Sequence, residues 1–445
     1  MLLTALSCLV IQAVYGFRSD VSLHGESGLK VQVQDQPGIS QVYVSIQQTN
    51  GVITDHAATK QPTSNGKKWI YLDNNSGVNP GDKVSYRTNV VYNGDLVTSE
   101  WYEDEATYPL ELVRSMRSHT VFRDDFTTWS PDHYNIIVTA NRGGNNEFQV
   151  YTNRYQNLYV KEGKLYIAPT ETVNDAHFDE NKLYHGRMDV KGLWGECDYS
   201  WNWGCDRTAA TDILPPIMSG RIRTHAAIRY GRVNVRAKLP LGDWIWPAIW
   251  LLSKDEKYGQ WPKSGEIDIM ESRGNLWMDY HDNKNHAITQ VSSTLHWGTS
   301  PEQNKHDMTH NSKQKWGGGN WHDDFHVYSL EWTDSHIITY VDNVEIMHVR
   351  TPGNGFWGWG GFHGNNIWSS GGKNAPFDQY FQLILNVAVG GDFFPDGARY
   401  SHPKPWSQRS PHPMRDFWER RGEWQKTWFG EEACMAIDYV EMIQY

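Results

Sequence analysis

The sequence predicts an all-β protein in which a large two-sheet sandwich, a β-jelly roll, follows a small Ig-like β-sandwich. Three observations predict this fold class. Segments of alternating apolar and polar residues recur along the chain, clusters of Gly, Pro and Asn separate them, and convincing amphipathic helices are few. The 445 residues allow two or three domains at about 100–200 residues each, and a hydrophobic content of 39% supports a packed core.

Residues 1–16, MLLTALSCLVIQAVYG, are predicted to be a secretory signal peptide. An apolar stretch ends in the permissive residues Val14 and Gly16 before a polar start, although a basic N-terminal region is missing. The stretch is shorter than the roughly 20 apolar residues of a membrane span. No other segment is apolar enough to span a bilayer, so we expect a secreted, extracellular protein without a membrane partner.

The small β-sandwich is expected over residues 17–105. Period-two alternation marks its strands, and PG, NG and NPGD turns separate them. The alternating segments are LKVQV (29–33), VYVSI (42–46), WIYL (69–72) and VSYRTNVV (84–91).

Residues 106–119 are predicted to be a linker, and the second domain is expected over residues 120–445. DDFHVYSLEWTDSHIITYVDNVEI has the pattern of an antiparallel meander, and YFQLILNVAV (380–389) is apolar enough to be buried on both faces. The best helix candidate is MRDFWERRGEWQKTW (414–428). Many short strands and Gly-rich loops favour a large sandwich or jelly roll.

Two covalent modifications are predicted. Cys8 leaves with the signal peptide, Cys197 and Cys205 can close a small loop as a disulfide, and Cys434 remains as a buried free thiol. A zinc site at the first pair is disfavoured, because no second Cys/His pair has suitable spacing. Asn74 begins the sequon Asn-Asn-Ser, a candidate glycosylation site in a turn.

Charge and aromatic content narrow the class of ligand. The net charge of −11 argues against nucleic acid, because a phosphate-binding surface needs a basic stripe. An acidic protein that handles a polymer is expected to handle a neutral one. Of the 22 Trp, only Trp69 and Trp101 precede residue 120, and so many indoles suggest aromatic platforms in the second domain.

SGEIDIMES (264–272) places three acids in an apolar strand. Glu266 and Asp268 share one face, because residues two apart in a strand point the same way, whereas Glu271 has the opposite parity. A β-bulge near Met270 would return Glu271 to the face of the other acids, and bulges are frequent beside active sites.

With the bulge, the two glutamates stand about 13 Å apart at ~3.3 Å per residue along the strand. Side chains leaning inward reduce the separation of the carboxyls to roughly 5–6 Å, as in a retaining rather than an inverting glycosidase. Two alternatives stay open: an exposed acidic strand face without chemistry, and a calcium site, although the Gly turn of a calcium loop is missing.

The segment LGDWIWPAIWLL precedes the acids. In a strand, Trp244, Trp246, Ala248 and Trp250 share one face, and flat indoles suit the apolar faces of pyranose rings. A core role for one or two of these indoles is the alternative. Pro247 fits poorly inside a central strand, so we expect an irregularity there.

Seven segments carry a resemblance to a known family. They are YGRVNVRAKLPLGDWIWPAIWLL, YGQWPKSGEIDIMESRGN, STLHWG, FHVYSLEW, FQLILNVAVGGDFFPDG, PKPWS and MAIDYVEMIQ. Together they resemble glycoside hydrolase family 16, and within it the animal endo-β-1,3-glucanases (laminarinases) and β-1,3-glucan recognition proteins. The resemblance covers roughly residues 120–445. It implies a jelly roll with a concave substrate cleft, a retaining mechanism and no required cofactor.

The resemblance also implies roles for the acids. Glu266 matches the nucleophile, Glu271 the general acid/base and Asp268 the middle carboxylate. Three close carboxylates cannot all ionise cheaply, so one proton is expected to stay on the trio.

Six further positions are implied to contact sugar. Trp246 and Trp250 match stacking positions, and His296 lies beside the acids or is a structural histidine. The polar side chains of Asn146 and Arg223 reach sugar hydroxyls or are structural, and Trp261 lines the far end of the cleft. Two more features have weaker counterparts in the family. Trp357 and Trp359 form a rim or pack internally, and Asp438 matches a position near a structural calcium in some members.

The first domain is similar to the glucan-binding module of the recognition proteins (carbohydrate-binding module family 39). GLKVQVQDQPGISQVYVSI and GKKWIYLDNNSGVNPGDKVSYRTNVVYNG carry this similarity, and QQTNGVITDHAATKQPTSNG departs from it. The domain binds glucan or is a sandwich that has lost binding. The sequence as a whole is interpreted as a monomeric hydrolase of β-1,3-glucan. A non-hydrolytic glucan receptor of innate immunity and a hydrolase of mixed-linkage glucan are the alternatives.

Overall fold

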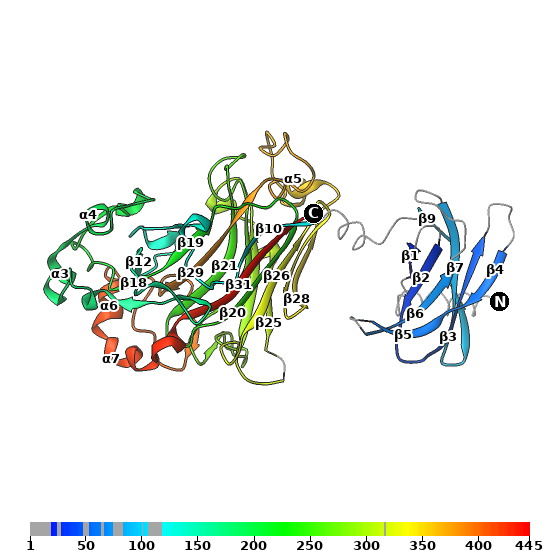
Figure 1. Cartoon of the computed structure of the whole chain (residues 1–445), viewed down its shortest axis with the longest axis horizontal. Coiled ribbons are helices and arrows are strands. Elements are labelled where there is room, and N and C mark those ends of the chain that lie inside the picture. The colour runs from blue at the N-terminus through cyan, green and yellow to red at the C-terminus, as the bar shows by residue number, and fades with distance from the viewer. Residues whose placement is uncertain are drawn as a thin grey trace. The chain divides into compact units, whose positions relative to one another are not determined.

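A computed structural model describes residues 19–24, 28–47, 53–63, 66–73, 83–99, 101–105, 118–315 and 317–445. The chain divides into two compact units, Met1–Arg117 and Ser118–Tyr445, and Figure 1 shows both as strand-rich bodies. The predicted signal peptide, Asn74 and nearly all of the predicted linker lie outside the described residues. No helix in the described ranges is long and apolar enough to cross a membrane.

The first unit is a small β-sandwich. One sheet has the order β1-β2-β6-β5, and the other has the order β4-β3-β7-β8 with β9 also on β7. The strands are β1 (Ser19–His24), β2 (Gly28–Gln34), β3 (Ile39–Gln47), β4 (Ile53–Ala57), β5 (Thr59–Thr63), β6 (Gly66–Asp73), β7 (Lys83–Tyr92), β8 (Asp95–Thr98) and β9 (Tyr102–Glu105). Alternate residues such as Val31 in β2 and Val44 in β3 face one shared core, which explains the period-two sequence pattern.

The second unit is a larger sandwich, the β-jelly roll that the sequence predicts. Its outer sheet has the order β13-β14-β31-β20-β26-β27-β28, with β10 also on β31. These strands are β10 (His119–Asp124), β13 (Leu158–Lys161), β14 (Lys164–Ile167), β20 (Gly231–Lys238), β26 (His326–Trp332), β27 (His336–Val341), β28 (Val344–Arg350) and β31 (Met435–Gln444).

The other large sheet carries the candidate site and has the order β11-β19-β29-β21-β22-β24-β25. Its strands are β11 (Tyr134–Ile136), β19 (Arg221–Thr224), β21 (Ile245–Ser253), β22 (Glu266–Glu271), β24 (Gln290–His296), β25 (His310–Gln314) and β29 (Phe381–Val389). Val235 and Leu330 of the outer sheet meet Ile249, Ile267 and Leu383 of this sheet in one core. The opposite face of this sheet is therefore free to form a cleft.

Strand β29 is buried along its whole length, as its apolar sequence predicts. Its place between β19 and β21 provides partners on both edges, and side chains such as Leu385 and Asn386 fill opposite faces.

Short elements complete the unit. The remaining strands are β12 (Gln149–Tyr151), β15 (Thr170–Glu171), β16 (Arg187–Asp189), β17 (Asp206–Thr208), β18 (Ile217–Ser219), β23 (Met278–Asp279) and β30 (Arg399–Tyr400). The α-helices are α3 (Glu180–His185), α4 (Val190–Trp194), α5 (Gly355–Trp359), α6 (Pro413–Glu419) and α7 (Arg421–Trp424).

The helix expected over 414–428 is broken. Helix α6 ends at Glu419, α7 covers only Arg421–Trp424, and a 3₁₀ turn follows at Gln425–Thr427. The rings of Phe417 and Trp424 stack with centroids 4.4 Å apart. A straight helix would separate these positions by about 10 Å at 1.5 Å per residue, so this core contact requires the break.

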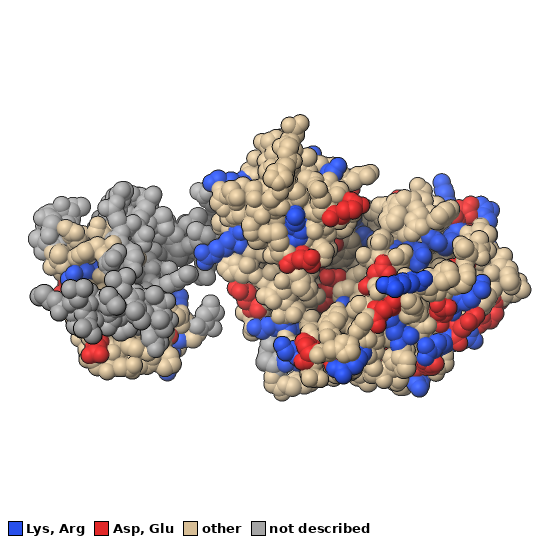
Figure 2. Space-filling model, turned by 180° about the vertical axis from the view of Figure 1, so that it is seen from behind, with Lys and Arg blue, Asp and Glu red and all other residues tan. Residues whose placement is uncertain are grey.

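The surface carries charges of both signs. On the face shown in Figure 2, Lys and Arg side chains alternate with Asp and Glu side chains over the second unit. Neither sign of charge forms an unbroken patch on this face.

Candidate active site

The three acids of β22 lie on one face because the strand contains a bulge. Asp268 pairs with Trp250 of β21, and Glu271 pairs with Ala248. Between these two pairs, β22 contains one residue more than β21. The same shift occurs against β24 between Asp268 and Glu271. Ile269 and Met270 are both fully buried in the core, and Glu271 therefore points to the cleft, as the predicted bulge near Met270 requires.

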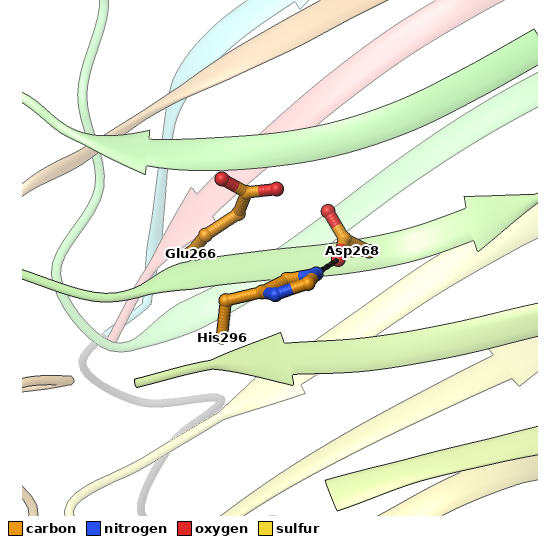
Figure 3. Close-up of side chains that lie close together, drawn as sticks. All are labelled: Glu266, Asp268 and His296. Atoms are coloured by element: carbon orange, nitrogen blue, oxygen red, sulfur yellow. Dashed lines mark ion pairs between the residues drawn. The ribbon is translucent and has the colours of Figure 1, made fainter. Parts of the chain in front are cut away.

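Each acid has its own aromatic or imidazole neighbour. Glu266 Oε2 accepts a hydrogen bond from Trp261 Nε1 at 2.8 Å, and Glu271 Oε1 accepts one from Trp246 Nε1 at 3.1 Å. Asp268 Oδ2 lies 3.1 Å from His296 Nε2. Figure 3 shows Glu266 and Asp268 rising from one strand and His296 reaching them from the next strand.

His296 is held on both sides of its ring. Asn304 Nδ2 lies 2.7 Å from Nδ1 of His296, which leaves Nε2 directed at Asp268. When Asn304 donates this bond, Nδ1 is the acceptor, and the Nε2 edge of the ring faces the Asp268 carboxyl. His296 therefore combines the two predicted roles: it is a structural partner of an acid, and it lines the cleft.

Burial raises the pKa of all three carboxyls. The pKa of Glu266 is well above its ordinary value because burial disfavours its charge and the Asp268 carboxyl lies beside it. Burial and then Glu271 raise the pKa of Asp268 well above its usual range. Burial also raises the pKa of Glu271, while His296, Arg273 and the Trp246 bond act in the opposite direction. The cluster therefore retains protons at a pH where exposed carboxyls are ionised.

This shift predicts a pH-dependent cost in stability. A carboxyl whose pKa is higher in the folded state contributes full stability below the unfolded pKa and loses it as the pH rises through the folded pKa. At pH 7, Glu266→Gln should therefore stabilise the second unit by about 1 kcal/mol, the size of a typical single-substitution effect, because it removes a charge that burial and Asp268 disfavour. The melting temperature should rise by about 2–4 °C, measured by calorimetry between pH 4 and 8.

The gain from Glu266→Gln should vanish near pH 4, where the wild-type carboxyl is also neutral. The exposed acid Glu162 offers a matched control, since Glu162→Gln removes one charge without relieving a buried one. A gain for Glu266→Gln that is equal at pH 4 and pH 8 would contradict the burial argument.

The tryptophans near the acids differ in accessibility. Phe393 covers one face of Trp246, with ring centroids 4.2 Å apart and planes 7° apart, and Arg273 lies 3.8 Å above Phe393. Trp250 donates to Asn386 Oδ1 at 2.6 Å. Trp261 is 41% exposed and bonds to Glu266. Trp246 therefore positions Glu271, and Trp261 offers the most open indole of the three.

Trp244 does not share the face of Trp246 and Trp250. Trp244 lies just before the start of β21 and has a left-handed φ of 68°. Its ring is buried against Phe394 and Trp406. The core alternative is thus correct for this residue. Pro247 lies within β21, and the irregularity occurs on the neighbouring strand, between Asp268 and Glu271.

The acids open into a cavity of about 1270 Å³. Arg223 lines it, and its Nη2 donates to the Ser253 carbonyl at 3.3 Å. Asn146 lines an adjacent cavity of about 760 Å³ instead, where its Nδ2 donates to Asp392 Oδ2 at 2.8 Å. A left-handed φ of 55° at Asn146 accompanies this placement, and its neighbours Asn145 and Glu147 line the acid cleft.

The Gly-rich loop tryptophans pack internally. Trp359 stacks on Trp297 at 5.3 Å, and Trp357 lies edge-on to Trp368 at 6.0 Å. Neither Trp357 nor Trp359 lines the acid cleft, so the packing alternative holds and the rim alternative does not.

A largely buried network in the lining of the cleft was missed by the sequence interpretation. Glu147 accepts hydrogen bonds from Gln149 Nε2 at 2.5 Å and from the Tyr151 hydroxyl at 3.2 Å. Asn386 Nδ2 donates to that hydroxyl at 3.0 Å, and the Asn386 amide oxygen accepts from Trp250. Burial raises the pKa of Glu147. The period-two spacing of Glu147, Gln149 and Tyr151 was the available signal, the same one that marks the acids.

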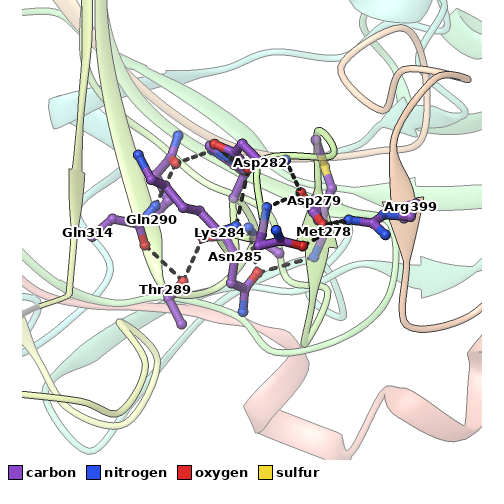
Figure 4. A network of polar contacts seen from close by, with 12 residues as sticks. Met278, Asp279, Asp282, Lys284, Asn285, Thr289, Gln290, Gln314 and Arg399 are labelled. Carbon is purple, nitrogen blue, oxygen red and sulfur yellow. Dashed lines mark hydrogen bonds and ion pairs between the residues drawn. The ribbon is translucent and has the colours of Figure 1, made fainter.

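A polar network surrounds Asp279, as Figure 4 shows. Asp279 is fully buried, accepts backbone N–H bonds from Asp282 and Asn283, and forms an ion pair with Arg399. Further bonds link Thr289 and Gln290 to Gln314 of β25. The loop that presents Tyr280 and His286 to the cleft, and Gln290 at the start of β24, are therefore held from several sides.

The three cysteines among the described residues adopt the predicted states. Cys197 and Cys205 form a disulfide with Cα atoms 5.6 Å apart, and Cys434 is a buried free thiol.

Two groups of residues are relevant to the predicted alternatives of a calcium site. Asp438 Oδ2 is 2.6 Å from Arg236 Nη1, so this carboxylate already has a cationic partner. Glu266, Asp268 and His296 each offer one ligand atom within 4.8 Å of the others. Calcium prefers about six to eight oxygen ligands, and this set with one imidazole nitrogen fits it poorly.

Comparisons with known proteins agree on two segments. The model for glycosyl hydrolases family 16 matches residues 196–356. The model CBM39, described as a carbohydrate binding domain (family 32), matches residues 17–105.

Three relatives illustrate the range of similarity. A β-1,3-glucan-binding protein of Penaeus monodon is 42% identical over 339 residues, which cover 72% of this chain and 89% of that protein. The β-1,3-glucan-binding protein 1 of Galleria mellonella is 28% identical and covers 89% of this chain and 88% of its own length. Glucan endo-1,3-β-glucosidase A1 of Niallia circulans is 35% identical over 58% of this chain and 30% of its own length. The solved laminarinase from Rhodothermus marinus covers 74% of this chain and 98% of its own, at 24% identity and a TM-score of 0.45.

Proposed function

The chain belongs to glycosyl hydrolase family 16, in the group that includes the animal β-1,3-glucan-binding proteins, and from this premise we propose that it is a secreted, endo-acting hydrolase of β-1,3-glucans. The observation that carries the proposal is the bulge in β22, which turns Glu266, Asp268 and Glu271 to one face of a cleft. A protein that only grips a glucan does not need two glutamates on either side of a buried aspartate.

The proposed reaction is a double displacement with net retention. The Glu266 carboxylate attacks the anomeric carbon, while Glu271 gives its proton to the departing glycosidic oxygen and a glycosyl-enzyme ester forms. Glu271, now ionised, takes a proton from water, and the resulting hydroxide breaks the ester and frees Glu266. The raised pKa of Glu271 supports its first role, because a general acid must carry a proton near neutral pH.

Asp268 and its neighbours determine which carboxyl carries the remaining proton. A nucleophile must be ionised, yet burial and Asp268 both raise the pKa of Glu266. We infer that Asp268 holds the proton of the pair when substrate is bound, so that Glu266 carries the charge. The titration then belongs to the trio and not to one residue. Trp261 Nε1 favours the ionised form of Glu266 by donating to Oε2.

The lining of the cleft supports the proposed substrate class. A cavity of about 1270 Å³ exceeds the ~300–1,000 Å³ of common small-molecule pockets and suits several sugar rings. Trp250, Trp261 and His296 supply flat surfaces, and Arg223 supplies a polar group. The match of residues 17–105 to a carbohydrate-binding domain supports a second glucan contact in the first unit.

Secretion is part of the proposal. The apolar N-terminal sixteen residues and the Cys197–Cys205 disulfide both suit an oxidising, extracellular setting. We propose that the mature protein acts as a monomer.

A non-hydrolytic glucan receptor is the second candidate. The names of the relatives from Penaeus monodon and Galleria mellonella describe binding and not hydrolysis, and this favours it. Incubation of the purified mature chain with laminarin separates the two. Release of reducing ends and a ladder of short oligosaccharides supports the hydrolase, whereas pull-down by insoluble glucan without release of sugar supports the receptor. Mixed-linkage glucan, run in parallel, tests the linkage preference.

A further inference from the structure

The disulfide loop Cys197–Cys205 displays two exposed indoles. Trp201 is 51% exposed and Trp203 is 69% exposed, whereas Trp is highly buried on average. Asn202 and Trp203 both have left-handed backbone angles, with φ of 51° and 57°. Such a conformation is unfavourable for a bulky residue and persists only where the surrounding structure imposes it.

The loop is fastened to the segment that enters the acid cleft. Beyond the disulfide, Asp198 Oδ2 accepts from the Val138 N–H at 2.6 Å, and the Gly204 carbonyl accepts from the Ala140 N–H at 2.8 Å. Asn202 Nδ2 donates to the Asn141 carbonyl at 2.9 Å. Because the loop is anchored along its length, the positions of its indoles are set by the fold.

Arg207 and Gly204 tighten the attachment. Arg207 donates to the carbonyls of Ala140 and Asn202. A Cβ atom at Gly204 would lie 2.0 Å from the Tyr199 carbonyl oxygen, so the chain approaches itself too closely for any other residue. The loop is thus built to hold its tip in one conformation.

The two indoles serve neighbouring cavities. Tyr199 and Trp201 line the acid cleft, and Trp203 lines the adjacent cavity of about 760 Å³. Asp392 lines both, so the cavities meet at this residue. The lining of the second cavity includes polar groups that can pair with hydroxyls, among them Arg187 and Gln408.

We propose that this loop is a binding platform on which a β-1,3-glucan chain continues beyond the acid cleft, with sugar rings stacked on Trp201 and then on Trp203. The choice of ligand rests on the proposed function, because the occupant is the chain that the cleft holds. Stacked indoles recognise the apolar face of a glucopyranose, and the cavity beyond supplies partners for its hydroxyls. Long glucans should therefore use Trp203, and short oligosaccharides that fill only the acid cleft should not.

The first test is the hydrolysis of long and short substrates by the full chain. Trp203→Ala should lower kcat/KM on polymeric laminarin by about tenfold, the size of one lost aromatic contact, and leave the β-1,3-linked trisaccharide unchanged. Trp203→Phe should restore much of the loss because it keeps a ring. Phe429→Ala is the matched control, since Phe429 is 67% exposed and lines neither cavity.

The second test measures directly whether a ligand covers Trp203. Full-length Glu266→Gln, which leaves the ligand intact, is oxidised with hydroxyl radicals, and Trp203 is quantified by mass spectrometry. Protection of Trp203 by a β-1,3-linked hexamer and not by the trimer supports the platform. Equal oxidation with and without hexamer, in a protein whose wild type degrades laminarin, overturns the platform and leaves the hydrolase standing. Protection together with an inert wild type supports the platform and overturns the hydrolase.

Discussion

Glu266→Gln should abolish the hydrolysis of laminarin, with a loss of about 10⁴-fold or more in kcat, because the proposed glycosyl-enzyme forms on the Glu266 carboxylate. Gln keeps the size of the side chain and still accepts the hydrogen bond from Trp261 Nε1. The cleft should therefore keep its shape, and glucan binding should stay within a few-fold of wild type. Reducing-end release and affinity for laminarin, measured on the same preparation, check both statements.

A matched control distinguishes the loss of a negative charge from the loss of the nucleophile. Glu345 lies on strand β28, outside the cleft, and Glu345→Gln should hydrolyse laminarin like the wild type. Melting curves at pH 7 add a second control, since Glu266→Gln is expected to melt higher than wild type. Turnover by Glu266→Gln within tenfold of wild type would remove Glu266 from the nucleophile role.

Glu271→Gln should lower kcat on laminarin by about 10²–10⁴-fold, the usual contribution of a general acid and base. The expected defect depends on the leaving group. In a nitrophenyl β-glycoside of a β-1,3-linked disaccharide, the nitrophenolate group leaves without protonation. Ester formation on Glu266 should therefore still proceed. Release of the ester needs Glu271 as base and should be slow.

The measurable result is a burst of nitrophenol close to one per protein, followed by slow turnover. Intact-mass spectrometry should then show the glycosyl-enzyme on Glu271→Gln and none on the Glu266→Gln, Glu271→Gln double variant. Trp246→Phe removes the hydrogen bond to Glu271 and keeps an aromatic ring, so it should cause a smaller loss and no accumulated ester. If Glu271→Gln is equally impaired on both substrates and shows no burst, Glu271 is not the proton donor.

Much of the candidate site was predictable because its signals are local. The parity of Glu266, Asp268 and Glu271 within one strand requires a bulge, and the bulge lies there. The spacing of Cys197 and Cys205 allows their disulfide. Period-two alternation found the main strands of both units, because one face of each sheet meets a core.

Other features depend on residues far apart in the sequence. Trp246 resembles a sugar platform in the sequence, but Phe393 covers its face, and only the pairing of β21 with β29 brings that loop over it. A helix over 414–428 follows from helical periodicity, but the chain ends α6 at Glu419, and the folded core brings Phe417 onto Trp424.

The sequence alone determined the all-β class, the family and the three acids, because strand parity and short motifs are properties of neighbouring residues. Only the tertiary structure decided which side chains reach the cleft. Asn145 and Glu147 line it while Asn146 turns away, since a left-handed backbone angle at one residue redirects its side chain. The exposure of Trp203 was likewise invisible in a chain with 22 Trp, because burial depends on contacts that close only on folding.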